Sequence, residues 1–187
     1  MFDFNDAAEN TGGKFLSPGV HTLKITGITD GVAGTGAPFI EMVLEDKAGL
    51  ICNHRYYLNT TTKEGSTKSA WEITKSNLVS LLAAINNTDF DTAKAALPKA
   101  TSPAELSANL SKVMVGKPFD VRLNGKEIQA NTAGKQNWIK AEIGGGKCFA
   151  PAGSNTLTFD ATKHVKMLSG LPASTSTNSA PVKPIWG

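Results

Sequence analysis

Apolar and polar positions alternate in three consecutive segments near the start of the chain. Residues 20–28, 39–46 and 50–58 read VHTLKITGI, FIEMVLED and LICNHRYYL, and apolar side chains occupy every second position. A period of two is typical of a strand with one buried face. The connections are short, a glycine-rich stretch at 29–38 and a turn at 47–49. The pattern therefore predicts an antiparallel meander of three strands.

The period changes after a polar stretch at 59–70. In WEITKSNLVSLLAAIN, residues 71–86, the leucines and isoleucines after Asn77 follow the spacing of one helix face. Residues 87–101 form a connector with room for a short helix. SPAELSANLSKVM, residues 102–114, predicts a further helix that opens with a capping box, with Ser102 as N-cap, Pro103 at N1 and Glu105 at N3.

Period-two alternation returns in VGKPFDVRLNGKEI, residues 115–128, and in WIKAEIGGG, residues 138–146. The dipeptide Asn124-Gly125 is typical of a tight turn. The order is three strands, a helical insertion over about 71–115, and two strands. This order predicts a mainly β fold with α, a five-stranded Greek-key barrel of the OB type. A β-sandwich is the alternative, although five strands are few for one.

Charge and composition divide the chain into three parts. The net charge is +3, but residues 1–13 hold three acids and no base, so the remainder is +6. We expect an acidic arm at 1–18, an OB-type domain at 19–150 and a C-terminal extension at 151–187. The extension is rich in Ser, Thr, Pro and Ala from about residue 169, which predicts disorder there.

Several classes of protein receive no support from the sequence. The N-terminus has no signal-peptide pattern and no apolar run reaches the length of a membrane span, so we expect a cytoplasmic protein without membrane partners. Cys52 and His54 share one face of a strand, but no second pair has metal-ligand spacing. The glycine-rich segment lacks the GK[ST] of a phosphate-binding loop. We therefore predict a protein that is not an enzyme and has no metal or cofactor, and the sequence leaves open whether Cys52 and Cys148 form a disulfide.

Cationic and aromatic side chains are concentrated on the outward face of the predicted strands. It contains both arginines of the chain, three aromatic residues and two lysines: Lys24, Phe39, Arg55, Tyr57, Arg122, Trp138 and Lys140. Cations neutralise phosphates and flat rings stack on unpaired bases, and neither contact depends on base sequence. The set predicts a platform for single-stranded nucleic acid. Taken singly, each residue also has a structural interpretation, such as pairing of Arg55 with Glu41, and a register slip of one residue would reverse any strand's faces.

Three segments resemble phage OB-fold single-stranded DNA-binding proteins. They are FDFNDAAENTGGKFLSPGVHTLKITG at 2–27, ITKSNLVSLLAAI at 73–85 and VGKPFDVRLNGKEI at 115–128, and the likeness covers about residues 1–145. The resemblance implies a protein that coats exposed single strands in phage DNA replication, recombination or repair in the host cytoplasm. Such proteins often end in an acidic tip that recruits replication or recombination proteins. This chain has Trp186 near its end but no acid there, which puts that recruitment in doubt.

The sequence leaves three further alternatives open. The helical region at 87–114 is longer than a minimal OB fold needs, so dimerisation through it is one alternative. The acidic arm and the Trp-containing tail also fit a non-catalytic structural or interaction protein of a virion. In a third hypothesis, the tail docks the protein on a polymerase or nuclease.

Overall fold

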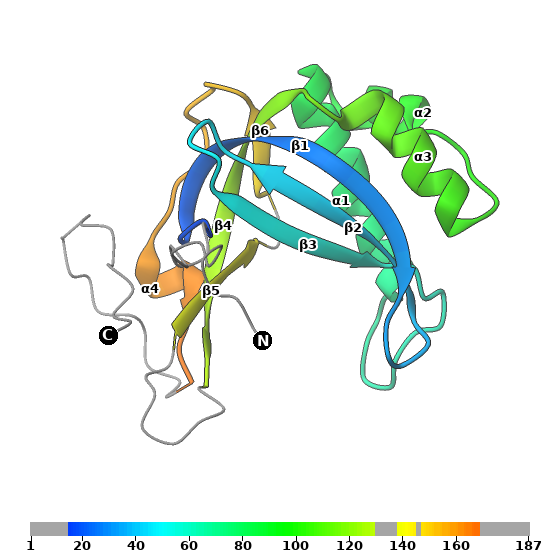
Figure 1. Ribbon diagram of the computed structural model, residues 1–187, viewed down its shortest axis with the longest axis horizontal. Helices are drawn as coiled ribbons and strands as arrows, with labels where there is room; N and C mark the ends of the chain where they lie inside the picture. Colours follow the sequence, from blue (N-terminus) through cyan, green and yellow to red (C-terminus); the bar gives the residue numbers. More distant parts are fainter. Residues whose placement is uncertain (1–14, 130–137, 145–146, 169–187) are drawn as a thin grey trace, which may run out of the picture.

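The structure is a computed structural model that describes residues 15–129, 138–144 and 147–168. Within these ranges it is a mixed α/β fold with a mostly antiparallel, open sheet of seven strands, together with four helices (Figure 1). Most of the predicted acidic arm and the tail from 169, where disorder is predicted, lie outside the described residues.

The principal strands follow the predicted order. They are β1 (Gly19–Val32), β2 (Pro38–Glu45), β3 (Ile51–Tyr57), β4 (Pro118–Ile128) and β5 (Trp138–Ile143). Neighbouring strands in the sheet run β3-β2-β1-β4-β5, and all of these pairs are antiparallel. The meander is therefore confirmed. β1 extends four residues beyond its predicted end, because residues 29–32 of the glycine-rich stretch pair with the start of β2.

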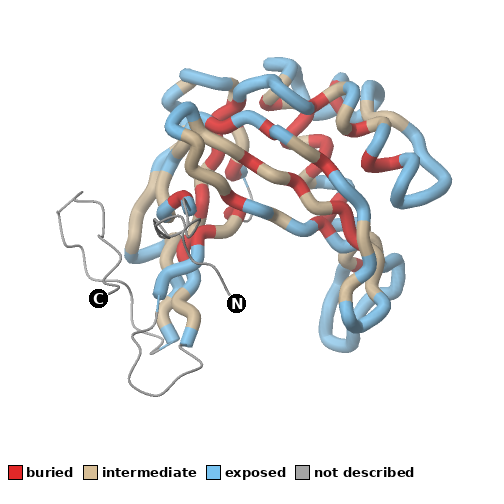
Figure 2. Tube along the Cα trace, in the orientation of Figure 1, coloured by how far each residue is buried: buried red, intermediate tan, exposed pale blue. Residues whose placement is uncertain are grey.

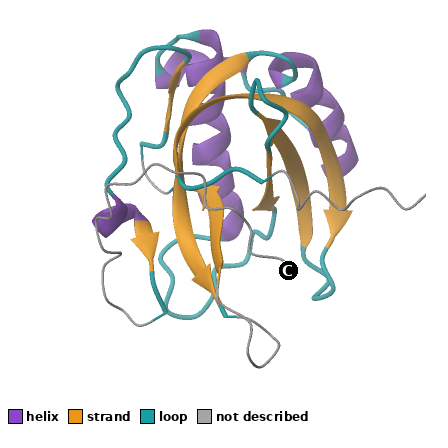
Figure 3. Ribbon diagram, turned by 60° about the vertical axis from the view of Figure 1, so that its left-hand side comes forward, coloured by secondary structure: helices purple, strands orange, loops and turns teal. Residues whose placement is uncertain are grey.

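The sheet does not close. β3 and β5 are its two ends, and no ladder joins them. They nevertheless contact each other, and the Cys52 thiol lies 3.9 Å from the carbonyl oxygen of Ala141. Figure 3 shows that the strands of the sheet are strongly curved. The described structure thus supports the strand order of the prediction and leaves the sheet open.

A bulge in β1 contributes to this curvature. The register with β2 shifts between Ile25 and Gly27, so one extra residue stands on β1 there. Bulges bend a strand and increase its twist. The carbonyl oxygen of Ile25 accepts a hydrogen bond from the backbone N–H of Gly116 at 2.9 Å, just after α3 (Pro103–Met114). The bend is therefore tied to the end of the helical insertion.

Residues after 147 also join the sheet. β6 (Phe149–Pro151) pairs antiparallel with β4, and β7 (Val165–Lys166) pairs parallel with β4 directly after α4 (Ala161–His164). The described part of the predicted C-terminal extension is thus attached to β4. At the other end of the chain, Leu16 is buried and its N–H donates to the carbonyl oxygen of Ile51 at 3.0 Å.

The three helices of the insertion between β3 and β4 lie together on one side of the sheet, whereas α4 lies apart from them, beside β7 (Figures 1 and 3). α1 (Ala70–Asn86) contacts β3, β4 and β6, whereas α3 contacts β1 and β2. The predicted short helix is α2 (Phe90–Ala96), which packs on α1. The inner face of the sheet and the apolar faces of α1 and α3 make one core, seen as the red segments in Figure 2.

The helix starts correct one prediction. Ser102 is the N-cap of α3, as predicted, but the Glu105 carboxylate accepts from the N–H of Thr101 at 2.7 Å instead of completing the box with Ser102. The full capping box is at α1. There Ser69 Oγ accepts from the Glu72 N–H at 3.2 Å, and the Glu72 carboxylate accepts from the Ser69 N–H at 2.8 Å.

The predicted turn at Asn124-Gly125 is wrong, because both residues lie inside β4. Gly125 is buried between neighbouring elements. A Cβ built there would lie 2.8 Å from Ile139 Cγ2 and 2.9 Å from Pro18 Cγ. This glycine permits close packing within a strand and makes no turn.

Candidate nucleic-acid interface

The strand register decides which side chains face outward. In the β2–β3 ladder, Phe39 is opposite Tyr57 and Glu41 is opposite Arg55, and opposed residues share a face. Tyr56 lies on the other face and is buried. Arg55 and Tyr57 therefore project from the outer face of β3, the orientation that the alternation predicts.

Arg55 is held by two contacts on this face. Its Nε donates to Glu41 Oε1 at 2.7 Å, and its Cζ lies 4.5 Å from the centroid of the Phe39 ring. The hydrogen bond and charge of Glu41 raise the pKa of Arg55, and Tyr57 adds to this effect. The guanidinium remains half exposed, since 50% of the Arg55 side chain is accessible. The structural alternative, an Arg55–Glu41 pair, is thus present.

Phe39 faces outward but is covered. Only 8% of it is exposed, and its ring lies across Gly31, where a Cβ would come within 2.7 Å of Phe39 Cζ. The Tyr57 ring meets it edge to face, with centroids 6.1 Å apart. Phe39 is therefore a support for its neighbours and offers no free ring face. Tyr57, at 39% exposure, offers the accessible ring.

Lys24 also has an acidic neighbour. Its Nζ lies 3.7 Å from Glu45 Oε1, and the two residues are opposed in the β1–β2 ladder. Glu41 and Glu45 thus stand on the outer face of β2 beside Arg55 and Lys24. The two positive and two negative formal charges on this part of the face balance. What it offers to a ligand is therefore the ring of Tyr57 and the oriented guanidinium of Arg55.

The outer face of β4, β5 and β7 differs, because its lysines have no such partners. Lys126 is opposed by Lys140 on β5 and by Lys166 on β7, which places three lysines in a row across three strands. All three are exposed, and among the described residues none forms an ion pair. Trp138 follows on the same face of β5 and is 51% exposed. This lysine row (Lys126, Lys140, Lys166) beside a free indole is the most cationic part of the outer face.

Arg122 stands apart from the lysine row. It is half-buried on β4, and its backbone N–H donates to the carbonyl oxygen of Cys148 at 2.8 Å. The charge of Arg122 lowers the pKa of the Cys148 thiol, but burial has the larger effect and raises this pKa to about 11. Arg122 therefore lies toward β6, and the structure does not bring it together with the other predicted cations.

The two parts of the outer face meet where β5 approaches β3. Lys140 precedes Ala141, whose carbonyl oxygen contacts Cys52. Burial, followed by the charge of Lys140, lowers the pKa of His54 on β3 to about 4. Lys140 is thus close enough to β3 to act on it electrostatically. The predicted residues form two groups: Lys24, Phe39, Arg55 and Tyr57 on β1–β3, and Trp138 and Lys140 on β5.

Sequence reasoning missed Lys126, Lys166 and Glu41 as members of this surface. Lys126 continues the alternation of Arg122 and Asn124 within residues 115–128, but it comes after the predicted turn at Asn124-Gly125, which is wrong. Lys166 belongs to a two-residue strand, which is too short to show a period. The sequence predicts Glu41 only as a structural partner of Arg55.

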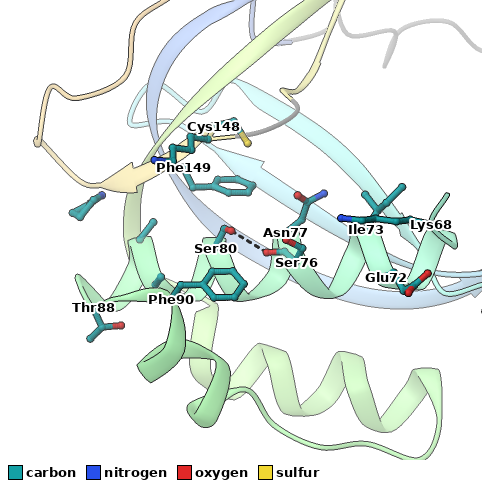
Figure 4. Close-up of a pocket in the computed structure, with 14 residues that line it drawn as sticks. Lys68, Glu72, Ile73, Ser76, Asn77, Ser80, Thr88, Phe90, Cys148 and Phe149 are labelled. Atoms are coloured by element: carbon teal, nitrogen blue, oxygen red, sulfur yellow. Dashed lines mark hydrogen bonds between the residues drawn. The ribbon is translucent and has the colours of Figure 1, made fainter. Parts of the chain in front are cut away.

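A separate groove lies on the helical side of the molecule. It has a volume of about 530 Å³ and lies between α1, the start of α2 and residues 147–151 (Figure 4). Its lining includes Ile73, Phe90 and Phe149, and in Figure 4 a hydrogen bond joins Ser80 to the Ser76 carbonyl, at 2.9 Å. None of these residues belongs to the outer face of the sheet.

Other site chemistry is limited in the described part of the chain. It holds no group of three His, Cys, Asp or Glu side chains arranged to bind a metal ion. Cys52 and Cys148 are both buried free thiols, which answers the disulfide question. No described helix has the length and apolar character needed to span a membrane.

Comparison with known proteins assigns no family. No family model matches the sequence, and a search of curated proteins finds no match. The functional conclusion therefore depends on the outer face of the sheet, with its lysine row, its two accessible rings and its oriented arginine.

Proposed function

We propose that the protein binds single-stranded DNA without sequence preference and has no catalytic activity. It would coat and protect exposed strands in phage DNA replication, recombination or repair. The observation that carries the proposal is the lysine row with Trp138 beside it on one face of β5, β4 and β7. Cations without acidic partners next to an accessible ring are the two components of a single-strand platform.

The strand order supports an OB-type assignment. In an OB fold, a five-stranded, partly open Greek-key barrel binds oligonucleotides on the face of its strands 2–3 and with the loops that connect strands 1–2 and strands 4–5. Here the order is β3-β2-β1-β4-β5, with the helices inserted between β3 and β4. The Cys52–Ala141 contact lies where β3 and β5 would complete such a barrel. We therefore assign the domain to an open form of this architecture.

The division of the face into two parts fits an unpaired strand. The lysine row would bind phosphates, and Trp138 and Tyr57 would each stack on a base, a contact that contributes about 1–3 kcal/mol per base. Figure 1 shows the β1–β2 loop and the far ends of β4 and β5 extending on the same side of the molecule. A single strand of DNA lying between them would follow the outer face from Trp138 toward Tyr57.

A competition experiment tests this function. Fluorescence anisotropy would follow a labelled oligo-dT with unlabelled single-stranded or duplex DNA as competitor. We expect the single strand to compete strongly, and the Tyr57→Ala/Trp138→Ala variant to bind much more weakly than the unchanged protein. Phe90→Ala is the matched control, because Phe90 is an exposed ring on α2, away from this face.

Two results would reject the proposal. One is the absence of oligo-dT binding at low salt, and the other is equal competition by duplex DNA. In the first case, stable association with virus particles would favour a structural role in the virion.

Removal of the segment after residue 168 should leave DNA binding intact, and loss of a polymerase or nuclease partner on that removal would identify the tail as the recruiting segment.

A further inference from the structure

We propose that Glu41 is a positioning residue that holds Arg55 ready for a phosphate, next to the base that stacks on Tyr57. Together Arg55 and Tyr57 would bind one nucleotide of the strand. This inference rests on the proposed function and adds to it a named subsite and the residue that orients it. It is carried by the contacts around Arg55 on the outer face of β2 and β3.

The hydrogen bond between the two side chains leaves part of the guanidinium unoccupied by Glu41. A guanidinium has five N–H donors in a fixed planar fork. Glu41 Oε1 accepts from Nε at 2.7 Å, on the inner edge of that fork. The two terminal nitrogens stand outside this hydrogen bond. Through these two nitrogens the guanidinium can bind a phosphate with two parallel hydrogen bonds.

The ring beneath Arg55 is itself held in place. Phe39 packs on the backbone of Gly31 so closely that a Cβ there would approach its ring to 2.7 Å. The edge of Tyr57 meets Phe39 from the neighbouring strand. Arg55 therefore has a support below it and a carboxylate at one edge. Two contacts at different points of a planar group fix its orientation before a ligand arrives, which reduces the entropy lost on binding.

The second glutamate on this face provides the contrast. Glu45 also lies on the outer face of β2, and its partner Lys24 is 3.7 Å away, beyond hydrogen-bond distance. An ammonium on a flexible stem gains no fixed orientation from such a pair. Glu45 thus acts only as a negative charge near the strand. Glu41 has the same charge on the same strand face, and in addition it orients its partner.

The experiment compares alanine variants at these two glutamates in the full chain. Each variant would be titrated against labelled oligo-dT by anisotropy, with denaturant unfolding to confirm that it folds. We expect Glu45→Ala to bind more tightly than the unchanged protein, because it removes a negative charge. Glu41→Ala removes the same charge, yet we expect it to bind about three- to tenfold more weakly, because the orientation of Arg55 is lost.

Two further variants test whether Glu41 acts by orienting the Arg55 guanidinium. Glu41→Gln keeps an acceptor oxygen for Nε, so it should restore binding to at least the unchanged affinity. Arg55→Lys keeps the charge but has no planar fork, so it should weaken binding about as much as Glu41→Ala. In the Arg55→Lys background, Glu41→Ala should cause no further loss, because the two changes remove one shared interaction.

The possible failures are distinct. If Glu41→Ala tightens binding as Glu45→Ala does, Glu41 competes with phosphate and the inference is wrong. If Glu41→Ala has no effect, or if its effect adds fully to that of Arg55→Lys, the inference is also wrong. In each of these cases the proposed function survives, since oligo-dT still binds. If the unchanged protein does not bind oligo-dT at all, both the function and the subsite are rejected.

Discussion

Lys126 on β4 and Lys140 on β5 are directly opposed in the antiparallel ladder, and Lys166 of β7 pairs with Lys126 from the other side. Like charges opposite each other in a sheet are destabilising. In the described structure no carboxylate forms an ion pair with any of the three. An anionic ligand along this row would relieve the repulsion, which is the physical reason to regard it as a phosphate-binding surface.

The lysine row predicts how salt dependence responds to mutation. Binding of phosphates to cations releases counterions, and each lost contact reduces the slope of log affinity against log salt by about 0.7 for a single strand. Lys126→Gln, Lys140→Gln and Lys166→Gln should each reduce the slope by about this amount. Their unfolding free energies should stay equal or rise slightly. Lys112→Gln, an exposed lysine on α3, is the control and should leave the slope unchanged.

Trp138 predicts a spectroscopic signal. Its indole is half exposed on the outer face, whereas Trp71 is partly buried against the core with Lys75 Nζ 5.8 Å from its ring centroid. Oligo-dT should quench tryptophan fluorescence by stacking on Trp138. Trp138→Phe should remove most of the quenching and keep most of the affinity, because a phenyl ring still stacks. Quenching that persists in Trp138→Phe and disappears in Trp71→Phe would place the DNA elsewhere.

The close contact between Gly31 and the Phe39 ring predicts the effect of a mutation at Gly31. A methyl group at Gly31 must displace the Phe39 ring, so Gly31→Ala should destabilise the fold by about 1–3 kcal/mol through overpacking. It should also weaken oligo-dT binding, because Arg55 and Tyr57 both contact that ring. Gly27→Ala is a matched control on the same face of β1, where a Cβ meets nothing within 4 Å. Denaturant unfolding and anisotropy check both effects, and equal results for the two glycines would contradict this role of Phe39.

His54 predicts how stability depends on pH. Its pKa is about 4 in the folded protein and 6.5 when unfolded, so below pH 6.5 the unfolded state binds more protons. Its contribution to stability is therefore complete above pH 6.5 and declines as the pH falls toward 4, by about 1.4 kcal/mol per pH unit. Between pH 7 and pH 5 the free energy of unfolding should fall by about 2 kcal/mol from this group. His54→Phe keeps the ring contact with Tyr56 and should show a smaller fall, and an unchanged fall would show that other groups are responsible.

The alternation of side chains predicted which residues face outward, but it did not predict which of them are accessible. Arg55 and Tyr57 lie on the outer face as expected, because a period of two has only one solution once Tyr56 is inside. Phe39 faces outward and is nevertheless covered. The burial of Phe39 depends on which residues oppose it on the two neighbouring strands. This register is a tertiary property, so it cannot be predicted from the pattern of one segment.

The same reason explains the pairing of the cations. Arg55 meets Glu41 and Lys24 meets Glu45 only because three strands align at these positions. Lys166 joins Lys126 through a pairing of residues far apart in the sequence. The prediction of the meander and of the helical insertion succeeded because these elements are long enough to show their own periods.

The most direct test of the central claim is the affinity of the unchanged protein for oligo-dT measured by anisotropy at a series of salt concentrations. With three lysines and Arg55 each contacting a phosphate, we predict that log affinity falls against log salt with a slope of about −3. Binding that is absent at the lowest salt, or that does not change with salt, would contradict the account.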